Sequence, residues 1–145
     1  MSSKRQLLMI DDFLLTKLSA GFLTLFYLFL SFRIGYFRGS PVMKLIFKMD
    51  KDISEKKLER NVRAHGNFSE YVPLFLILLF LSEYFKLLNF MHLSILCLIF
   101  IYGRLAHAIC FAFYDHNPFL RISGMISTYL VLFILSVILL SNSMI

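Results

Sequence analysis

Four long apolar stretches, separated by short polar segments, constrain this chain more than any other feature of its sequence. An α-helix rises about 1.5 Å per residue, so about 20 apolar residues span the roughly 30 Å hydrocarbon core of a membrane. Hydrophobic residues make up 59% of the 145 residues, above the roughly 45–50% of soluble domains. We therefore expect an all-α fold, an integral membrane four-helix bundle that forms one domain. The expected domain covers residues 1–145, with helices at about 13–37, 54–84, 90–113 and 120–140.

The placement of charge indicates which ends of the helices face the cytoplasm. Fifteen Lys and Arg against nine Asp and Glu give a net charge of +6, and most of the bases flank the first two apolar stretches. This placement argues against nucleic-acid binding and is typical of cytoplasmic loops. We expect the 33–63 loop and the 114–119 turn to be cytoplasmic and both termini to lie on the other side, although Lys4 and Arg5 argue weakly against this. Residues 1–12 lead to no small-residue cleavage site, so we expect the first helix to be retained.

Cysteines and small residues carry weaker signals. Cys97 and Cys110 lie in the third stretch with no CxxC or Cys/His spacing, which indicates free thiols and no metal site. Gly124 and Thr128 form one of several pairs of small residues at four-residue spacing, which allow membrane helices to approach closely. Chance explains any single such pair equally well.

Polar side chains inside the apolar stretches are the best candidates for a functional site. They are Arg63, Asn67, Glu70, Arg104, His107 and Arg121. The first three have i, i+4, i+7 spacing and the next two i, i+3 spacing, so each set shares one helix face. An ionised side chain at membrane depth costs several kcal/mol unless it is paired or faces a polar cavity. We expect all six to converge near one level at the cytoplasmic end.

The signs of these charges predict an anionic ligand. Three arginines face the single acid Glu70, and Arg38 at the end of the first helix adds a further cation. Guanidinium groups bind carboxylates in a bidentate manner, and Glu70 suits an ammonium group. A ligand that carries carboxylates and an amine fits such a site.

Several interpretations without a ligand remain open. Arg63, Asn67 and Glu70 form a self-contained clamp in one of them, and Arg104 pairs with Glu70 in another. Arg121 is placed to face lipid headgroups in a third. A histidine in the position of His107 more often forms a hydrogen bond between helices than carries a proton.

The same residues resemble a known family. Residues 59–73 read ERNVRAHGNFSEYVP and closely resemble the signature of the MAPEG family, membrane-associated proteins in eicosanoid and glutathione metabolism. Residues 103–107, GRLAH, are similar to the third-helix motif of that family, and Arg121 stands where the family places an arginine at the head of its fourth helix. The resemblance covers about residues 13–140 and is closest to the bacterial branch, which implies a bacterial inner membrane.

The resemblance implies a homotrimer of left-handed four-helix bundles with glutathione at each subunit interface, on the cytoplasmic side. The implied glutathione contacts are Arg38, Arg63, Asn67, Glu70, Arg104 and His107. Arg121 matches the arginine that stabilises the glutathione thiolate in catalytic members. A cation beside sulfur lowers the thiol pKa and raises the nucleophilic fraction.

Two functions follow from this resemblance. The first is a glutathione-dependent transferase or peroxidase that acts on hydrophobic electrophiles or lipid hydroperoxides. The second is a non-catalytic MAPEG-like protein that binds lipid or glutathione and presents it to a partner. Phe111 favours the second, because catalytic members often carry tyrosine at this position. A transporter or channel ranks last, because the runs 74–81 and 131–140 carry no ionisable residue.

Overall fold

The computed structural model describes residues 13–47 and 54–144, and each element in them is a helix. These are α2 (Leu14–Phe37), α3 (Pro41–Phe47), α4 (Glu55–Tyr84), α5 (Phe90–Phe113) and α6 (Pro118–Ser143). All but the short α3 are long and apolar enough to cross a membrane. The expected all-α fold is confirmed. The charges of Lys4 and Arg5, the residues up to Asp12 and residues 48–53 of the basic segment lie outside the described residues.

The expected 33–63 loop overlaps the helices expected at 13–37 and 54–84, and the structure has helix in both overlaps, because α2 ends at Phe37 and α4 begins at Glu55. Helix α3, in the interval between them, was not expected. The expected 114–119 turn is also too long, because α6 begins at Pro118. The Asn117 side chain accepts a hydrogen bond from the Leu120 amide at 3.1 Å, and an Asn cap followed by proline is a strong helix start.

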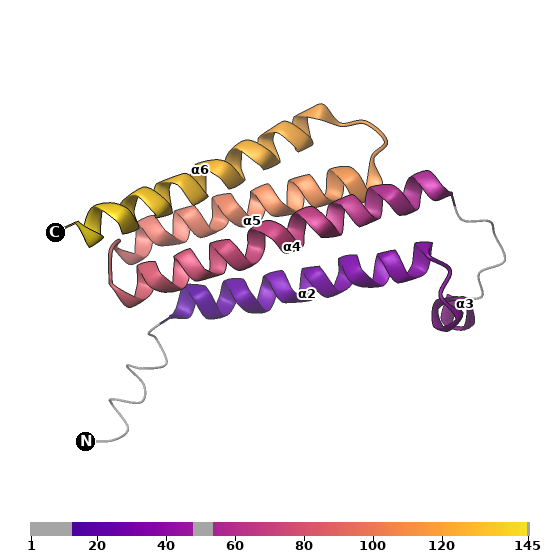
Figure 1. Cartoon of the computed structure of the whole chain (residues 1–145), viewed down its shortest axis with the longest axis horizontal. Helices are drawn as coiled ribbons and strands as arrows, with labels where there is room; N and C mark the ends of the chain where they lie inside the picture. Colours follow the sequence, from indigo (N-terminus) through magenta and orange to yellow (C-terminus); the bar gives the residue numbers. More distant parts are fainter. Residues whose placement is uncertain (1–12, 48–53, 145) are drawn as a thin grey trace, which may run out of the picture.

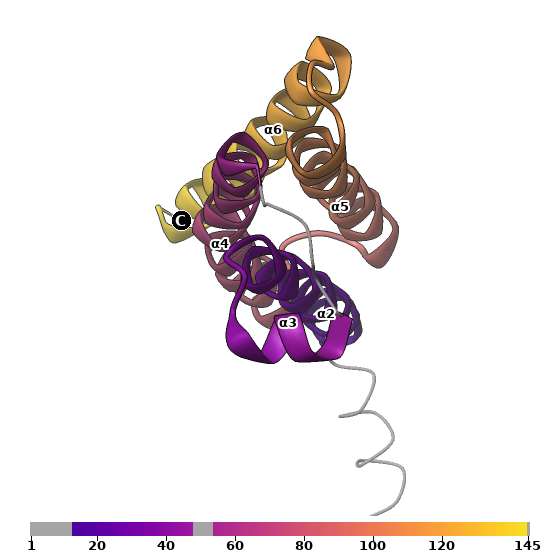
Figure 2. The same cartoon turned by 90° about the vertical axis from the view of Figure 1, so that its right-hand side faces the viewer.

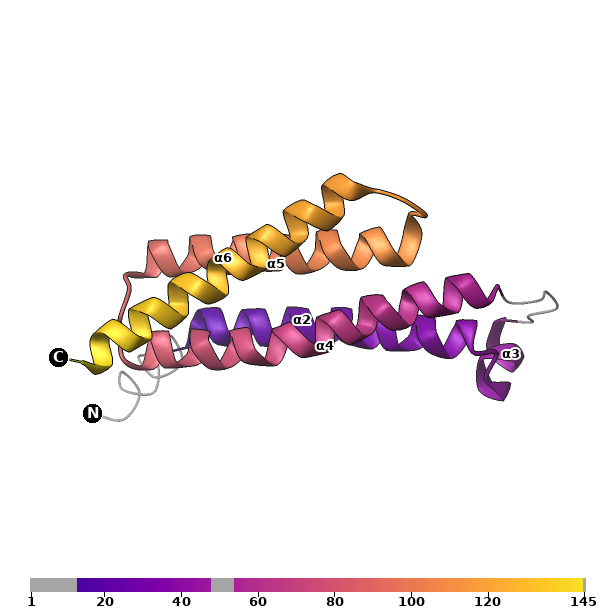
Figure 3. The ribbon, with the colours of Figure 1, turned by 45° about the horizontal axis from the view of Figure 1, so that its top comes forward.

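The long helices run along the long axis of the molecule (Figure 1). The α5–α6 turn and α3 lie at one end, and the α4–α5 connection and the carboxyl terminus lie at the other (Figures 1 and 3). The view onto the first of these ends shows α4 between α2 and α6 (Figure 2), and α4 contacts α2, α5 and α6. Helix α4 is therefore the element on which side chains from the other helices converge.

The distribution of apolar side chains fits a lipid environment. Phe75 and Phe100 stack at 3.8 Å between ring centres inside the bundle, where both are fully buried. Large apolar side chains also cover the outside, such as Leu25, Leu98 and Phe133, each about two-thirds exposed. Apolar surfaces this extensive mark contact with lipid or protein. The chain is therefore an integral membrane protein.

Helices α5 and α6 approach each other closely at two glycines, Gly103 and Gly124. A Cβ atom on Gly103 would lie 2.9 Å from the Gly124 carbonyl oxygen, and one on Gly124 would lie 2.8 Å from the Gly103 carbonyl oxygen. Real Cβ atoms do not tolerate such distances, so both positions need glycine at this spacing. The close approach places Thr128 directly against α5 and beside Arg104, where the candidate site begins.

Charged side chains from neighbouring helices satisfy two helix ends. The Glu83 carboxylate accepts hydrogen bonds from the amides of Leu15 at 3.1 Å and Thr16 at 2.9 Å, in the first turn of α2. These amides have no partner within their own helix, and the positive end of the helix dipole favours an acid there. Glu83 therefore ties the start of α2 to the end of α4.

The carbonyl oxygens at the end of α5 are contacted by cations, whereas the amides at the start of α2 are contacted by an acid. Arg60 of α4 donates through Nη2 to the carbonyl oxygens of Cys110, at 3.0 Å, and of Tyr114. Arg33 of α2 donates through Nη2 to the Ala112 carbonyl oxygen at 2.8 Å. Carbonyls at a helix end lack intrahelical partners and favour cations. Two arginines in largely apolar helices are thereby given a structural role.

Candidate functional site

Arg104 is the most deeply buried charged side chain among the described residues, with 2% of its surface exposed. Its Nε donates to Thr128 Oγ1 at 2.9 Å, and its Nη1 donates to the backbone carbonyl oxygen of Asn67 at 3.3 Å. The guanidinium carbon lies 4.8 Å from the centre of the Tyr71 ring. We call these four residues the Arg104 cluster. All its contacts are neutral, and no carboxylate of the described residues forms an ion pair with Arg104.

Thr128 links this cluster to the glycine contact. Its hydroxyl donates to the Gly124 carbonyl oxygen at 2.8 Å, which leaves the oxygen free to accept from Arg104. The hydroxyl of Tyr71, whose ring lies over the guanidinium, is 3.1 Å from the hydroxyl of Tyr129. A buried arginine held only by neutral groups stays protonated and carries an uncompensated desolvation cost. The cluster therefore favours an anion nearby.

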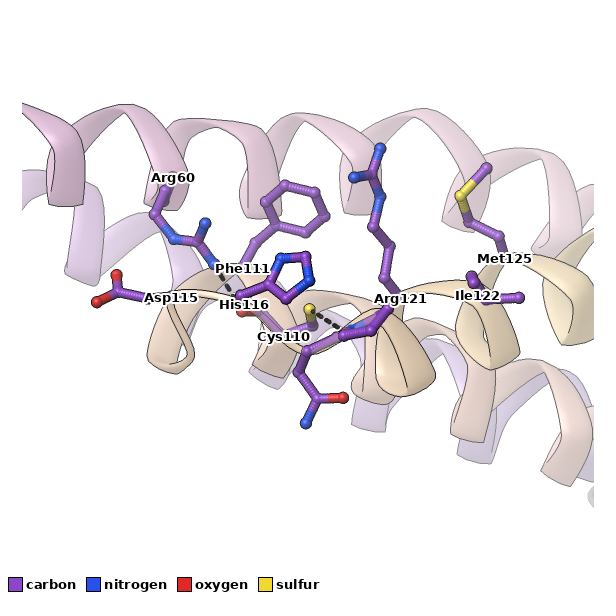
Figure 4. Close-up of a pocket in the computed structure, with 10 residues that line it drawn as sticks. Arg60, Cys110, Phe111, Asp115, His116, Arg121, Ile122 and Met125 are labelled. Atoms are coloured by element: carbon purple, nitrogen blue, oxygen red, sulfur yellow. Dashed lines mark hydrogen bonds between the residues drawn. The ribbon is translucent and has the colours of Figure 1, made fainter.

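Arg121 lies in the first turn of α6 and lines a pocket of about 400 Å³. Residues from the start of α4, the end of α5 and the start of α6 form this Arg121 pocket (Figure 4). The Phe111 ring lies between two cations, with the guanidinium carbons of Arg60 and Arg121 at 5.5 and 5.7 Å from its centre. Ile122 and Met125 supply an apolar wall. The pocket thus combines two arginines and one acid, Asp115, with an apolar surface.

His107 lies between the Arg104 cluster and the Arg121 pocket. It is buried, with 4% exposure, and its ring centre is 4.9 Å from that of Phe111. Both Arg104 and Arg121 act on it electrostatically. Arg121 precedes Thr128 by seven residues, which is about 10 Å along a helix. The helical rise therefore spreads Arg104 and Arg121 along the bundle, with His107 between them.

Arg63 and Glu70 point outward from α4. The Arg63 Nη2 lies 2.6 Å from Glu59 Oε1, one turn earlier on the same helix, and both side chains are exposed. Glu70 is exposed and forms no ion pair with a described residue. Neither the Arg63–Glu70 clamp nor the Arg104–Glu70 pair is formed. Both charged groups remain accessible to a ligand or to another protein chain.

Arg38 is set apart from the other candidates. It follows the last residue of α2, is exposed, and acts electrostatically on His65. His65 faces α2, since its Nε2 lies 2.9 Å from Ser31 Oγ. No contact among the described residues joins Arg38 to the Arg104 cluster or to Arg121. Within one chain, Arg38 therefore lies on the α2 side of α4.

Three contributors to the site were not identified from the sequence as such. Tyr71 lies four residues after Asn67, one turn along the same face, which is the signal that could have found it. In the sequence, Thr128 was identified only as a small residue that allows helices to approach closely. Arg60 stood out only as part of the motif, and its contact with Phe111 depends on how α4 packs against α5.

The arrangement is suited to binding an anion. Two guanidinium groups at different depths, with His107 between them, present positive charge beside an apolar wall. No group of His, Cys, Asp and Glu side chains in residues 13–47 and 54–144 is placed to hold a metal ion. Charge-assisted hydrogen bonds to carboxylates or to a thiolate are the interactions that such arginines make most strongly.

A model of the MAPEG family matches residues 16–141, a range that includes every candidate residue described above. No curated protein matches the chain.

Proposed function

Since the chain belongs to the MAPEG family, we propose that it is a membrane-bound glutathione-dependent transferase or peroxidase. Its second substrates are hydrophobic electrophiles or lipid hydroperoxides that partition into the bilayer. The family contains such enzymes and also non-catalytic members, so the choice between them depends on the site.

The observation that carries the proposal is the excess of positive charge around a buried arginine. Arg104 has neutral partners only, and Arg121 lines the neighbouring pocket without an acid paired to it among the described residues. Glutathione carries carboxylates, an ammonium group and a thiol, so it matches this set of groups. The proposed carboxylate and backbone contacts are Arg38, Arg63, Asn67, Arg104 and His107. Glu70 receives the ammonium group.

Arg121 is proposed as the catalytic residue. A guanidinium beside the glutathione sulfur stabilises the thiolate and therefore lowers the thiol pKa. The thiolate sulfur forms a bond to an electrophilic carbon of the substrate, whose leaving group departs with the bonding electrons. The Phe111 ring, 5.7 Å from the Arg121 guanidinium carbon, supports the side chain but offers no hydroxyl. The positive charge of Arg121 therefore has to stabilise the sulfur.

The apolar side of the Arg121 pocket supports a hydrophobic second substrate. Ile122 is more than half exposed, and it lines the pocket together with Met125. A substrate dissolved in the bilayer reaches such a wall without entering water. The active site would then lie at the end of the bundle that carries the α5–α6 turn, on the cytoplasmic side of a bacterial inner membrane.

A homotrimer is part of the proposal. Arg63, Glu70 and Arg121 are exposed in the single chain although they belong to membrane helices, and facing lipid would be costly for each. Within the described part of one chain, no contact joins Arg38 to these residues. A neighbouring copy that covers this face of α4 would bury these charges and bring its own Arg38 to the site.

Activity of the purified chain in detergent tests the enzyme proposal. We expect conjugation of glutathione to 1-chloro-2,4-dinitrobenzene, or reduction of a lipid hydroperoxide, to fall about 10²-fold in Arg121→Ala, as for loss of one oxyanion donor. Arg121→Lys keeps the charge and should retain part of the activity. Lys86→Gln, at the opposite end of the bundle, removes one exposed charge and should change neither rate.

The second candidate is a non-catalytic protein that binds glutathione or lipid and presents it to a partner. Phe111 favours it, because a ring without a hydroxyl supplies one donor fewer to a bound ligand. Equilibrium dialysis with labelled glutathione distinguishes the two. Saturable binding without turnover of either substrate would support the second candidate and contradict the first.

A further inference from the structure

Two further pockets lie around α2, and none of the residues proposed to hold glutathione or its thiol lines them. One is a groove of about 450 Å³ along the last turns of α2, lined by Phe29, Phe32, Arg33, Tyr36 and Phe37. Phe32 is 61% exposed and Phe29 42% exposed, so the groove opens to the outside of the bundle. We call it the aromatic groove.

The neighbouring pocket is basic. It has a volume of about 230 Å³, lies between α2, α4 and the end of α5, and is lined by Arg33, Lys57, Arg60 and Asp115 among others. The single acid of its lining, Asp115, is 4.0 Å from the ammonium nitrogen of Lys56 and is therefore partly neutralised. Three cations thus face one partly neutralised acid. We call it the basic pocket.

Arg33 lines both pockets and is held in a fixed orientation. Its Nε donates to Asn61 Oδ1 at 2.9 Å and its Nη2 to the Ala112 carbonyl oxygen at 2.8 Å. Its guanidinium carbon lies 4.1 Å from the centre of the Phe113 ring. Its Nη1 makes no hydrogen bond to a residue in the described part of the chain. The guanidinium therefore keeps donor capacity and positive charge at the junction of the two pockets.

The cations of the basic pocket lie at the ends of membrane helices, where lipid headgroups are expected. Arg33 lies in the last two turns of α2, and Lys57 and Arg60 lie in the first two turns of α4. Charged heads at helix ends reach the interface while their stems remain beside apolar surface. Basic pockets between membrane helices bind acidic lipid headgroups. The aromatic groove continues from this level along α2 toward the membrane interior.

From this junction we infer that the chain binds an anionic phospholipid. The phosphate lies in the basic pocket against Arg33, Lys57 and Arg60, and one acyl chain lies in the aromatic groove against Phe29 and Phe32. A free phosphate ion would use the first pocket and leave the second without a role. Arg60 also contacts Phe111, which lines the Arg121 pocket. A lipid phosphate bound to Arg60 therefore stabilises the contact that separates the two pockets.

Native mass spectrometry of the full chain in a mild detergent tests the inference. The probes are phosphatidylglycerol and phosphatidylcholine with identical acyl chains. We expect phosphatidylglycerol to bind more tightly and to remain bound at the lower concentration. Equal binding of the two lipids would overturn the inference, because charge complementarity would then contribute nothing.

Substitutions at one position separate charge from structure. Lys57 is exposed and its side chain makes no hydrogen bond to a described residue, so its replacement leaves the helices intact. Lys57→Gln should weaken phosphatidylglycerol binding about fivefold, from about 1 kcal/mol per interfacial cation, whereas Lys57→Arg should not. The control Lys86→Gln removes one exposed lysine at the other end of the bundle and should have no effect. Unchanged binding in Lys57→Gln would contradict the inference.

The acyl-chain half of the site has its own test. Phe32→Ala shortens the wall of the aromatic groove and should weaken binding of phosphatidylglycerol, while the affinity of the basic pocket for inorganic phosphate stays unchanged. Inorganic phosphate should displace the lipid only at far higher concentration. If inorganic phosphate displaced phosphatidylglycerol at concentrations equal to that of the lipid, the acyl chain would contribute nothing to binding. The basic pocket would then be a site for small anions, and the lipid inference would fail.

Discussion

At the scale of single residues, the chain buries a cation that forms no ion pair with a carboxylate in the described part of the chain. Arg104 is 2% exposed and rests on a hydroxyl, a carbonyl and an aromatic ring. Thr128 holds the guanidinium while its own proton is taken by the Gly124 carbonyl. The arrangement fixes the direction of the charge without cancelling it, which is what an anion-binding site in a membrane needs.

The contribution of Thr128 can be measured in the absence of any ligand. Thr128→Val preserves the shape but removes the acceptor for the Arg104 Nε, so we expect a loss of about 1–3 kcal/mol of unfolding free energy. Thr128→Ser keeps the hydroxyl and should lose only about 1 kcal/mol, the value of a buried methyl group. Denaturant unfolding in detergent measures both. Equal losses in the two variants would show that the hydroxyl does not hold the buried cation.

Helical spacing predicts which residues share a helix face but not which groups they contact. Arg104 of α5 contacts α4 through the backbone carbonyl oxygen of Asn67, and that contact does not depend on the Asn67 side chain. The choice of Thr128 over Glu70 as the partner of Arg104 depends on the rotation and depth of α6 against α5. Those quantities are set by the contact between Gly103 and Gly124, which spacing within one helix cannot reveal.

At the scale of elements, the number and length of the long helices follow from the apolar stretches, whereas the structure of the segments that connect these helices does not. The bounds of α4 and α5 differ from the expected ones by at most a residue, because long apolar runs leave little choice. Helix α3 and the start of α6 were missed, since charge density dominated the interpretation of residues 33–63 and a proline was assigned to a turn. The two arginines that cap α5 likewise depend on tertiary packing.

The glycine contact makes a prediction about the α5–α6 pair. Gly124→Ala places a methyl group against the Gly103 carbonyl and the His107 backbone, so the helices must separate, at a cost of about 1–3 kcal/mol. Gly21→Ala is the matched control, because nothing lies within 4 Å of a Cβ atom there. It should be neutral or stabilising by up to about 1 kcal/mol. Thermal unfolding in detergent would contradict this account if the two variants behaved alike.

The Glu83 cap makes a prediction about the start of α2. Glu83→Ala leaves the amides of Leu15 and Thr16 without their acceptor, at a cost of about 1 kcal/mol. Hydrogen exchange of the first turn of α2 should accelerate about fivefold, the equivalent of that cost. Amides in the middle of α2 serve as the internal control and should keep their rates. Uniform acceleration along α2 would mean that Glu83 acts on global stability and not as a cap.

At the scale of the whole molecule, the alternation of helices gives the bundle two distinct ends. The α5–α6 turn, the start of α4 and the end of α2 share the end that carries the candidate site (Figure 1). The Arg121 pocket and the basic pocket both open near this end, on either side of the Arg60–Phe111 contact. The excess of basic residues there predicts that this end faces the cytoplasm.

Cysteine labelling in intact cells tests that orientation. Single substitutions Ser54→Cys and His116→Cys should be protected from a membrane-impermeant maleimide until the cells are opened. Lys86→Cys and Ser143→Cys should react from outside. The native Cys97 and Cys110 are each 4% exposed and should remain unlabelled in the unsubstituted protein. Labelling of residues 54 and 116 from opposite sides would contradict the bundle itself, and reversal of all four would contradict the cytoplasmic assignment.

The most direct test of the central claim is whether the chain ionises the thiol of glutathione. Glutathione is added to the purified protein at neutral pH, and the ultraviolet difference absorbance of the thiolate is recorded for the wild type and for Arg121→Ala. We predict a thiolate signal that saturates with glutathione in the wild type and disappears in Arg121→Ala, while glutathione still binds. Binding without any thiolate in the wild type would contradict a catalytic Arg121, and no binding would mean that the Arg104 cluster serves only to pack the helices.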